Sequence, residues 1–246
     1  MSVLKILITG AKGRMGQALI TSATNDPATE AHRTIDVGDS LLPNLEACDS
    51  VIDFSHHSFA TELIAACQKL NKPLVIGTTG HTDAELELIS NAAKTLPIVK
   101  AGNYSIGVNT LFWLTRKAAE ILGESFALEV LEMHHNKKID APSGTARRLV
   151  EVLAEVRGLS YKENVAHGRE GNIGARPKKE IGLHAIRGGD VVGDHTVIYA
   201  ADGERVELTH KASSREIFAN GAVRASKWLV GKPAGLYDME DVLGLR

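Results

Sequence analysis

Short apolar runs alternate with amphipathic stretches over the first hundred positions of the chain. The runs cover residues 3–9, 32–37, 50–54, 73–77 and 96–100, and helical spacing of apolar residues is found over 56–71 and 82–95. Strand patterns that alternate with helical patterns are typical of βαβ units, which build a parallel sheet with right-handed crossovers. The pattern predicts an α/β fold that begins with a Rossmann-type parallel sheet domain over residues 1–104.

The pattern changes after residue 104. A long helical pattern over 107–122 and a strand pattern over 126–133 are followed by a second helical pattern over about 142–157. Strand patterns over 181–187, 195–200 and 205–210 then follow one another without helices, which is typical of an antiparallel or mixed sheet. We expect a C-terminal α+β domain with a mixed sheet over residues 105–214. The last segment, residues 215–246, carries a helical pattern that we expect to return to the first domain.

A glycine loop separates the first strand from the helical pattern that begins near residue 15. Gly10, Gly13 and Gly16 form a GxxGxxG variant of the dinucleotide-binding loop. Gly10 would permit the tight turn, Gly13 would let the backbone approach a pyrophosphate, and Gly16 would let the helix pack closely on the strand. The N–H groups at the start of the helix would face the phosphates. Taken alone, such a loop can also be only a turn.

An acidic residue stands at the spacing expected for ribose recognition. Asp36 lies 20 residues beyond Gly16 (36 − 16 = 20), where dinucleotide-binding domains place the carboxylate that binds the adenosine ribose. Asp39 is a competing candidate, and a solvated turn acid is the alternative interpretation. Segments 54–57, 77–80 and 101–104 are small or polar and follow later strands, so they could line the same groove. We interpret His56 and His57 as cap or groove residues rather than metal ligands.

Composition narrows the functional class. The 246 residues are 43% apolar and 24% charged, and the net charge of −2 gives no reason to expect a nucleic acid or a membrane as partner. The chain shows neither a signal-peptide pattern nor an apolar run of about 20 residues, so we expect a cytoplasmic protein. Cys48 and Cys67 have no metal-ligand spacing and are expected to be buried reduced thiols.

The segment 132–145, EMHHNKKIDAPSGT, concentrates candidate chemistry. Two adjacent histidines and two adjacent lysines precede a helix-start signal. Histidine titrates near neutrality, and a lysine crowded by other cations can become a proton donor. A solvated basic loop is the competing interpretation. A zinc site is disfavoured because adjacent histidines lack the usual spacing and no third ligand is evident.

The same segment predicts an anion-binding helix terminus. Asp140 is a plausible N-cap and Pro142 suits the first helical turn. The N–H groups of Ser143, Gly144 and Thr145 would then be left without helical acceptors and could hold a carboxylate.

Motifs spread along the whole chain together resemble one enzyme family. They are Gly10–Gly16, VIDFS at 51–55, VIGTTG at 75–80, NYSIGVN at 103–109, HHNKKIDAPSGTA at 134–146 and HKASSR at 210–215. In this order they resemble the 4-hydroxy-tetrahydrodipicolinate reductase, or dihydrodipicolinate reductase, family of lysine biosynthesis. The HHxxKxDAPSGTA pattern is the specific one.

The resemblance implies an activity and roles for residues. The activity is NAD(P)H-dependent reduction of 4-hydroxy-tetrahydrodipicolinate to tetrahydrodipicolinate with loss of water, in the diaminopimelate route. His134 is implied as proton donor and acceptor, Lys138 as proton donor, and His135, Gly144 and Thr145 as substrate-binding groups. The implied cofactor-binding residues are Gly10, Ala11, Lys12, Gly13, Arg14, Met15, Asp36, Gly77, Thr78, Thr79, Ala101, Gly102, Asn103 and Tyr104.

The resemblance also implies a small dicarboxylate substrate and a homotetramer built through residues 105–214, and from the histidine spacing we expect no metal. One departure bears on the cofactor, since many family members have a basic residue after the ribose-binding acid and here Asp36 is followed by Val37. An acid disfavours a 2′-phosphate, while Lys12, Arg14 or Arg33 could neutralise one. We therefore expect NADH to be favoured over NADPH or used comparably.

Two other interpretations remain. A cofactor-binding sensor with this fold would have little use for an intact His134, Lys138 and Gly144-Thr145 set. Another two-domain dehydrogenase, acting on aspartate or homoserine, is disfavoured by the DAPSGT segment. Arg215 could orient a carboxylate or serve as an ion-pair partner at a hinge.

Overall fold

The computed structural model describes residues 3–246, which form two compact units. The first unit contains the chain up to Ile106 together with Arg215–Arg246, and the second unit contains Gly107–Ser214. No helix within residues 3–246 has both the length and the apolar character needed to cross a membrane.

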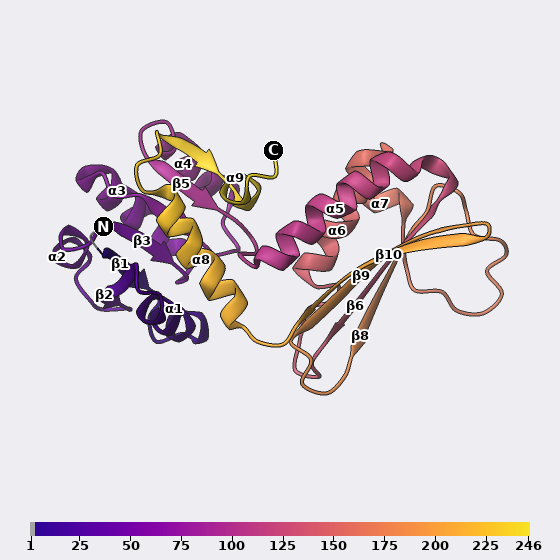
Figure 1. The fold of residues 1–246 in the computed structure, drawn as a ribbon, viewed down its shortest axis with the longest axis horizontal. Helices are drawn as coiled ribbons and strands as arrows, with labels where there is room; N and C mark the ends of the chain where they lie inside the picture. The colour runs from indigo at the N-terminus through magenta and orange to yellow at the C-terminus, as the bar shows by residue number, and fades with distance from the viewer. Residues whose placement is uncertain (1–2) are drawn as a thin grey trace. The chain divides into compact units, whose positions relative to one another are not determined.

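The first unit is built on a six-stranded parallel sheet (Figure 1). Its strand order is β11-β5-β4-β3-β1-β2. The strands are β1 (Leu4–Thr9), β2 (Thr29–Ile35), β3 (Ser50–Asp53), β4 (Leu74–Ile76), β5 (Pro97–Lys100) and β11 (Gly235–Tyr237). β2 and β3 lie on opposite sides of β1, so the strand order reverses there. In open parallel sheets, ligands bind beyond the carboxyl ends of the strands at such a reversal.

Helices cover both faces of this sheet. On one face lie α1 (Arg14–Asn25), α8 (Glu216–Leu229) and α9 (Met239–Leu243). On the other lie α2 (Leu41–Glu46), α3 (Ala60–Leu70), which follows the short helix η1 (His57–Phe59), and α4 (Asp83–Ala92). α8 runs beside α1 (Figure 1), which is how the C-terminal segment completes the first unit.

Burial on both faces explains the apolar runs in the sequence. In β1, Ile6 and Ile8 pack toward α1 and α8, whereas Leu7 packs toward α2 and α3, and all three are fully buried. A parallel strand covered on both faces reads as a continuous apolar run because neither set of side chains meets water. The predicted Rossmann-type sheet is confirmed. Cys48 and Cys67 are buried free thiols in this unit, and burial raises their pKa to about 11 and about 12.

The second unit contains a five-stranded mixed sheet with strand order β10-β9-β6-β8-β7. The strands are β6 (Ala127–His134), β7 (Val165–His167), β8 (Ile181–Arg187), β9 (Gly193–Ala201) and β10 (Glu204–Ala212). β6 pairs in parallel with β8 and antiparallel with β9, which confirms the predicted mixed sheet.

Two long helices pack on one face of the mixed sheet. They are α5 (Ile106–Leu122) and α6 (Gly144–Arg157), followed by η2 (Gly123–Ser125) and α7 (Tyr161–Asn164) respectively. Apolar residues of α5 and α6 share a core with Leu128 and Val130 of β6. The residues of β6 alternate between buried and half-buried, so one face of the strand meets these helices.

Six short elements have no counterpart in the sequence prediction: α2, η2, α7, β7, β11 and α9. Each contains three to six residues. A segment of this length spans less than two helical turns or two strand repeats. Such short elements therefore cannot be recognised from the periodicity of apolar residues.

Candidate active site

The glycine loop after β1 is shaped by close packing. Gly10 has a φ of +70°, and a Cβ at this position would lie 2.3 Å from the carbonyl oxygen of Phe54. A Cβ on Gly16 would lie 2.2 Å from the carbonyl oxygen of Gly10. Gly13 is the N-cap of α1 and makes no side-chain cap. The protein therefore requires Gly10 and Gly16, while Gly13 leaves the start of α1 open to an anion.

A cavity of about 630 Å³ lies at the carboxyl ends of β1, β2 and β3. It is lined by Thr9, Gly10, Gly13, Ile35, Asp36, Val37, Gly38, Asp39, Phe54, Ser55, His56, Ser58, Phe59 and Glu62. The cavity thus contains Gly10, Gly13 and Asp36 from the predicted cofactor residues, and also the competing Asp39. Its size, its acid and the uncapped helix start fit the adenosine and pyrophosphate of a dinucleotide.

Asp36 connects the end of β2 to the glycine loop. Its carboxylate accepts hydrogen bonds from the main-chain N–H groups of Lys12 at 2.8 Å and Val37 at 2.9 Å. These backbone hydrogen bonds lower the pKa of Asp36. Asp39 accepts a hydrogen bond from the N–H of Asp36 at 2.8 Å. The two acids therefore differ in position, with Asp36 joined directly to the glycine loop and Asp39 supporting the turn behind it.

Asp53 joins three loops at the same end of the sheet. It ends β3, is 3% exposed, and accepts hydrogen bonds from the hydroxyls of Thr9 at 2.5 Å, Ser55 at 2.5 Å and Thr78 at 2.6 Å. Thr78 is one of the predicted cofactor residues, and the N–H of Gly77 donates to the carbonyl of Asp53 at 2.8 Å. The predicted cofactor residues do not include Asp53, because its contacts depend on strand pairing.

The remaining predicted cofactor residues differ in exposure. The side chain of Tyr104 is buried in the core, and its hydroxyl donates to the carbonyls of Ile76 at 2.8 Å and Val99 at 3.1 Å. Ala11 is also buried. The others are exposed (Lys12, Arg14, Thr79, Gly102) or half-buried (Met15, Gly77, Ala101, Asn103).

The second unit buries a carboxylate beside the histidine pair. Glu132 and His134 are two residues apart on β6 and share its buried face. Glu132 has no exposed surface, and its Oε2 lies 2.5 Å from Nδ1 of His134. Arg187, at the end of β8, donates from Nη1 and Nη2 to the two carboxylate oxygens, both at 2.9 Å. The N–H of Ser143 donates to Oε1 at 3.1 Å.

These contacts determine the charge of Glu132. Burial alone raises its pKa, but the hydrogen bonds from His134, Arg187 and the Ser143 main chain outweigh burial and lower the pKa to about 2. Glu132 is therefore ionised at neutral pH.

The helix start differs from the sequence prediction. Ser143, not Asp140, is the N-cap of α6, and its Oγ accepts a hydrogen bond from the N–H of Ala146 at 3.2 Å. The helix begins at Gly144, so Pro142 precedes the cap instead of occupying the first turn. The prediction of Asp140 as N-cap is wrong, because the side chain of Asp140 is hydrogen-bonded to Lys138. The sequence also predicted that the N–H groups of Ser143, Gly144 and Thr145 would together bind a carboxylate. The N–H of Ser143 is instead hydrogen-bonded to Glu132.

Lys138 lies opposite an acid rather than among cations. Its Nζ is 2.9 Å from Oδ1 of Asp140, and this hydrogen bond lowers the pKa of Asp140. The main chain turns here, because the N–H of Lys138 donates to the carbonyl of His135 at 3.1 Å. The N–H of His135 donates to the carbonyl of Val191 at 2.8 Å. His134 thus ends β6, and His135 and Lys138 lie on the short turn that follows it. Glu132 connects His134 to the N–H of Ser143, next to Gly144.

A further buried histidine faces the same cluster. His195, on β9, is 4% exposed, and its Nε2 lies 3.1 Å from Oγ of Ser143. Its ring meets that of His134 edge-on, with 5.1 Å between centroids. Burial, with a smaller effect from His134, lowers the pKa of His195 to about 4, so the ring is neutral at pH 7. Arg187 and His195 were not predicted as site residues. Their positions could have suggested a role, because Arg187 is a polar residue at the end of one predicted strand and His195 is a polar residue at the start of the next.

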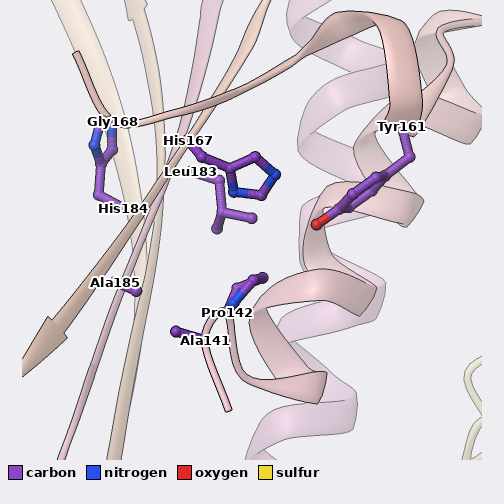
Figure 2. A pocket seen from close by; sticks show the side chains of 8 residues that line it. All are labelled: Ala141, Pro142, Tyr161, His167, Gly168, Leu183, His184 and Ala185. Carbon is purple, nitrogen blue, oxygen red and sulfur yellow. The ribbon is translucent and has the colours of Figure 1, made fainter. Parts of the chain in front are cut away.

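A second cavity, of about 680 Å³, lies elsewhere in the second unit (Figure 2). It is lined by Ala141, Pro142, Tyr161, His167, Gly168, Leu183, His184 and Ala185. It meets the 132–145 segment only through Ala141 and Pro142, and none of the residues predicted for proton transfer or substrate binding lines it. Within residues 3–246 no group of three or more His, Cys, Asp or Glu side chains is arranged to hold a metal ion.

Comparison with known proteins covers both units. Residues 4–104 match the family model for the N-terminus of dihydrodipicolinate reductase, and residues 107–243 match the model for its C-terminus. The chain belongs to the dihydrodipicolinate reductase family. The resemblance carried by the motifs is thereby confirmed, and the chain is an oxidoreductase whose N-terminal domain implies NAD(P)H as cofactor.

Two individual relatives agree with the family assignment, and a third protein shares the fold alone. The 4-hydroxy-tetrahydrodipicolinate reductase of Akkermansia muciniphila is 61% identical over 243 residues, 99% of either chain. Among solved structures, the dipicolinate-bound dihydrodipicolinate reductase from Paenisporosarcina sp. TG-14 is 25% identical, with a TM-score of 0.78 over 96% of this chain and 97% of that one. GenD2 from gentamicin A biosynthesis, solved in complex with NAD, shares the fold at 13% identity, with a TM-score of 0.60 over 100% of this chain and 91% of that one.

Proposed function

We propose that the chain reduces (2S,4S)-4-hydroxy-2,3,4,5-tetrahydrodipicolinate to (S)-2,3,4,5-tetrahydrodipicolinate with loss of water, in the diaminopimelate route of lysine biosynthesis. The observation that carries this proposal is the carboxylate of Glu132 on β6, which is hydrogen-bonded both to His134 and to the N–H of Ser143 at the start of α6. The 61% identity to a 4-hydroxy-tetrahydrodipicolinate reductase over almost the full chain supports it.

In the proposed site, the second unit binds the substrate and moves protons. His135, Gly144 and Thr145 bind a substrate carboxylate, which the N-terminus of α6 favours because of its N–H groups and its dipole. Lys138 donates a proton, and His134 donates or accepts one. The dipicolinate bound by the Paenisporosarcina relative supports a small dicarboxylate as ligand.

The first unit binds the nicotinamide cofactor in this proposal. Residues 10–15 and Asp36 hold its pyrophosphate and ribose, and 77–79 and 101–104 line the rest of the groove. When bound, NAD(P)H supplies a hydride to C4 of the ring after the 4-hydroxyl has left as water. The adjacent ring carbon then takes a proton, so that the hydride and the proton together saturate one C=C bond of the ring.

We favour NADH as the better cofactor. The carboxylate of Asp36 is joined to the glycine loop, and the next residue, Val37, is 95% exposed and uncharged. A 2′-phosphate would meet the charge of Asp36, which Lys12, Arg14 or Arg33 would have to offset. A ratio of kcat/KM values clearly above one for NADH over NADPH is expected, and a strong NADPH preference would refute it.

We also propose a cytoplasmic homotetramer assembled through the open face of the mixed sheet. That face carries the half-buried Leu131, Met133 and Ile198 and the exposed Ile186, more apolar surface than a solvated strand face needs. Sedimentation analysis of the wild type and of Ile198→Glu tests this. A tetramer that dissociates in the variant supports the proposal, and a wild-type monomer contradicts it.

The activity is tested by mixing the protein with freshly generated 4-hydroxy-tetrahydrodipicolinate and NADH that is deuterated at the transferred position. We expect NADH oxidation and a product with deuterium at C4. Absence of oxidation, or turnover of aspartate semialdehyde in its place, would reject the assignment.

A further inference from the structure

Glu132 contacts both parts of the proposed substrate site. Its carboxylate accepts hydrogen bonds from Nδ1 of His134, from the N–H of Ser143 and from both terminal nitrogens of Arg187. We propose that Glu132 is a positioning residue, which fixes the tautomer and orientation of His134 and holds the start of α6 beside it. This inference rests on the proposed function of His134 and α6.

The contact with Glu132 determines which nitrogen of His134 exchanges protons. An ionised carboxylate only accepts hydrogen bonds, so Nδ1 must carry the hydrogen that lies between the two groups. Within residues 3–246 no group is hydrogen-bonded to Nε2 of His134. The neutral ring therefore presents the Nε2 lone pair to a ligand and the cationic ring presents an Nε2–H, whereas the other tautomer would be unable to accept a proton there.

Arg187 keeps this carboxylate ionised. Its two-pronged contact is the geometry in which a guanidinium binds a carboxylate most strongly, and Nη2 also donates to the carbonyl of Asp140 at 2.8 Å. A buried carboxylate without such a partner would take up a proton and become a donor itself. The charged and titratable groups near His134 come from three strands. Glu132 is on β6, Arg187 is on β8 and the neutral His195 is on β9. Lys138 lies on the turn that follows β6. Beyond His195 stands His210 on β10, its direct cross-strand partner.

The bond to Ser143 extends the effect to substrate binding. Ser143 caps α6 with its Oγ and donates its N–H to Glu132, so the carboxylate fixes where Gly144 stands relative to His134. One side chain thus sets the distance between the proton-transfer nitrogen and the helix start that binds the substrate carboxylate. Loss of Glu132 should lower kcat through His134 and raise KM through α6.

Glu132→Gln is the direct test, with Glu129→Gln as a matched control. Glu129 lies on the opposite face of the same strand and is also hydrogen-bonded to arginines and a histidine, namely Arg169, Arg176 and His184. Because acid–base catalysis contributes about 10²- to 10⁴-fold, we expect Glu132→Gln to lower kcat/KM by about 10- to 100-fold. Glu129→Gln, compared at equal folded fraction and oligomeric state, should change it by less than about 3-fold. Equal losses in the two variants would overturn the proposal.

A double-mutant cycle separates positioning from a purely structural role. If Glu132 acts through His134, then Glu132→Gln should lower kcat by less than about 3-fold in a His134→Ala background, because interacting residues are not additive. A further loss of 10-fold or more in that background would contradict the inference. Dipicolinate binding, measured by calorimetry, should weaken in Glu132→Gln and not in Glu129→Gln.

Nitrogen-15 NMR of the wild-type protein tests the tautomer without any turnover. The His134 signals, identified by their loss in His134→Ala, should show a protonated Nδ1 and an unprotonated Nε2 in the neutral ring. An Nε2–H tautomer would refute the positioning role even if the enzyme is active. Conversely, an inactive wild type with the expected tautomer would reject the proposed function alone.

Discussion

Each of the two sheets buries a carboxylate beside its candidate ligand site, but the two carboxylates are satisfied differently. Asp53 in the first unit accepts from three hydroxyls, those of Thr9, Ser55 and Thr78. Glu132 in the second unit accepts from a histidine, an arginine and a main-chain N–H. The first arrangement positions loops with neutral groups, while the second assembles cationic and titratable groups. This difference motivates the proposed division of labour, in which the first unit shapes a cofactor groove and the second unit moves protons.

The largest expected effect concerns the packing of the glycine loop. Gly16→Ala would place a Cβ 2.2 Å from the Gly10 carbonyl, and overpacking of this kind costs about 1–3 kcal/mol or more. We expect the thermal midpoint to fall by roughly 4–10 °C. Gly144→Ala is the matched control, since its Cβ meets no atom within 4 Å; thermal unfolding should be unchanged, while KM for the substrate should rise. If the two substitutions destabilised the protein equally, the claim that Gly16 is tightly packed and Gly144 is not would be wrong.

The next effect concerns the acid stability of the second unit. Burial holds the pKa of His195 at about 4, below its ordinary 6.5, so the unfolded chain takes up this proton at a higher pH than the folded chain. The stabilisation is complete above pH 6.5 and is lost as the pH falls to about 4, by about 3 kcal/mol. Urea unfolding at both pH values should show this loss in the wild type and a smaller one in His195→Gln. An identical pH dependence would show that His195 titrates normally.

The smallest expected effect concerns Asp53. Asp53→Asn keeps one acceptor oxygen, and the three hydroxyls can reorient, so we expect a loss of only about 1–2 kcal/mol in the free energy of unfolding. NADH affinity should fall a few-fold through Thr78, with kcat at saturation retained. Asp26→Asn, which breaks a surface ion pair with Lys227, is the control and should cost less than about 1 kcal/mol. A large loss of kcat in Asp53→Asn would indicate that the first unit takes part in proton transfer, which would contradict the proposed difference between the two units.

The long elements could be predicted from the sequence because they follow local patterns, and the candidate chemistry was assigned to segment 132–145 from its local composition. The five apolar runs correspond to β1–β5, and the 132–145 segment contains the end of β6 and the start of α6. The Glu132–Arg187 and Ser143–His195 contacts join residues 55 and 52 positions apart. They depend on the pairing of β6 with β8 and β9, which local periodicity does not encode. The N-cap was misplaced because Asp140 and Ser143 are equally good caps by residue type, and only their tertiary partners distinguish them.

The division of labour between the units is tested most directly by measuring NADH binding and NADH oxidation in the same preparation of Lys138→Ala. NADH fluorescence titration should give a dissociation constant within about 2-fold of the wild type, because the cavity beyond β1–β3 is untouched. Oxidation of NADH with 4-hydroxy-tetrahydrodipicolinate should fall by about 100-fold or more, as expected for loss of a proton donor. Full turnover by Lys138→Ala, or loss of NADH binding, would contradict the account.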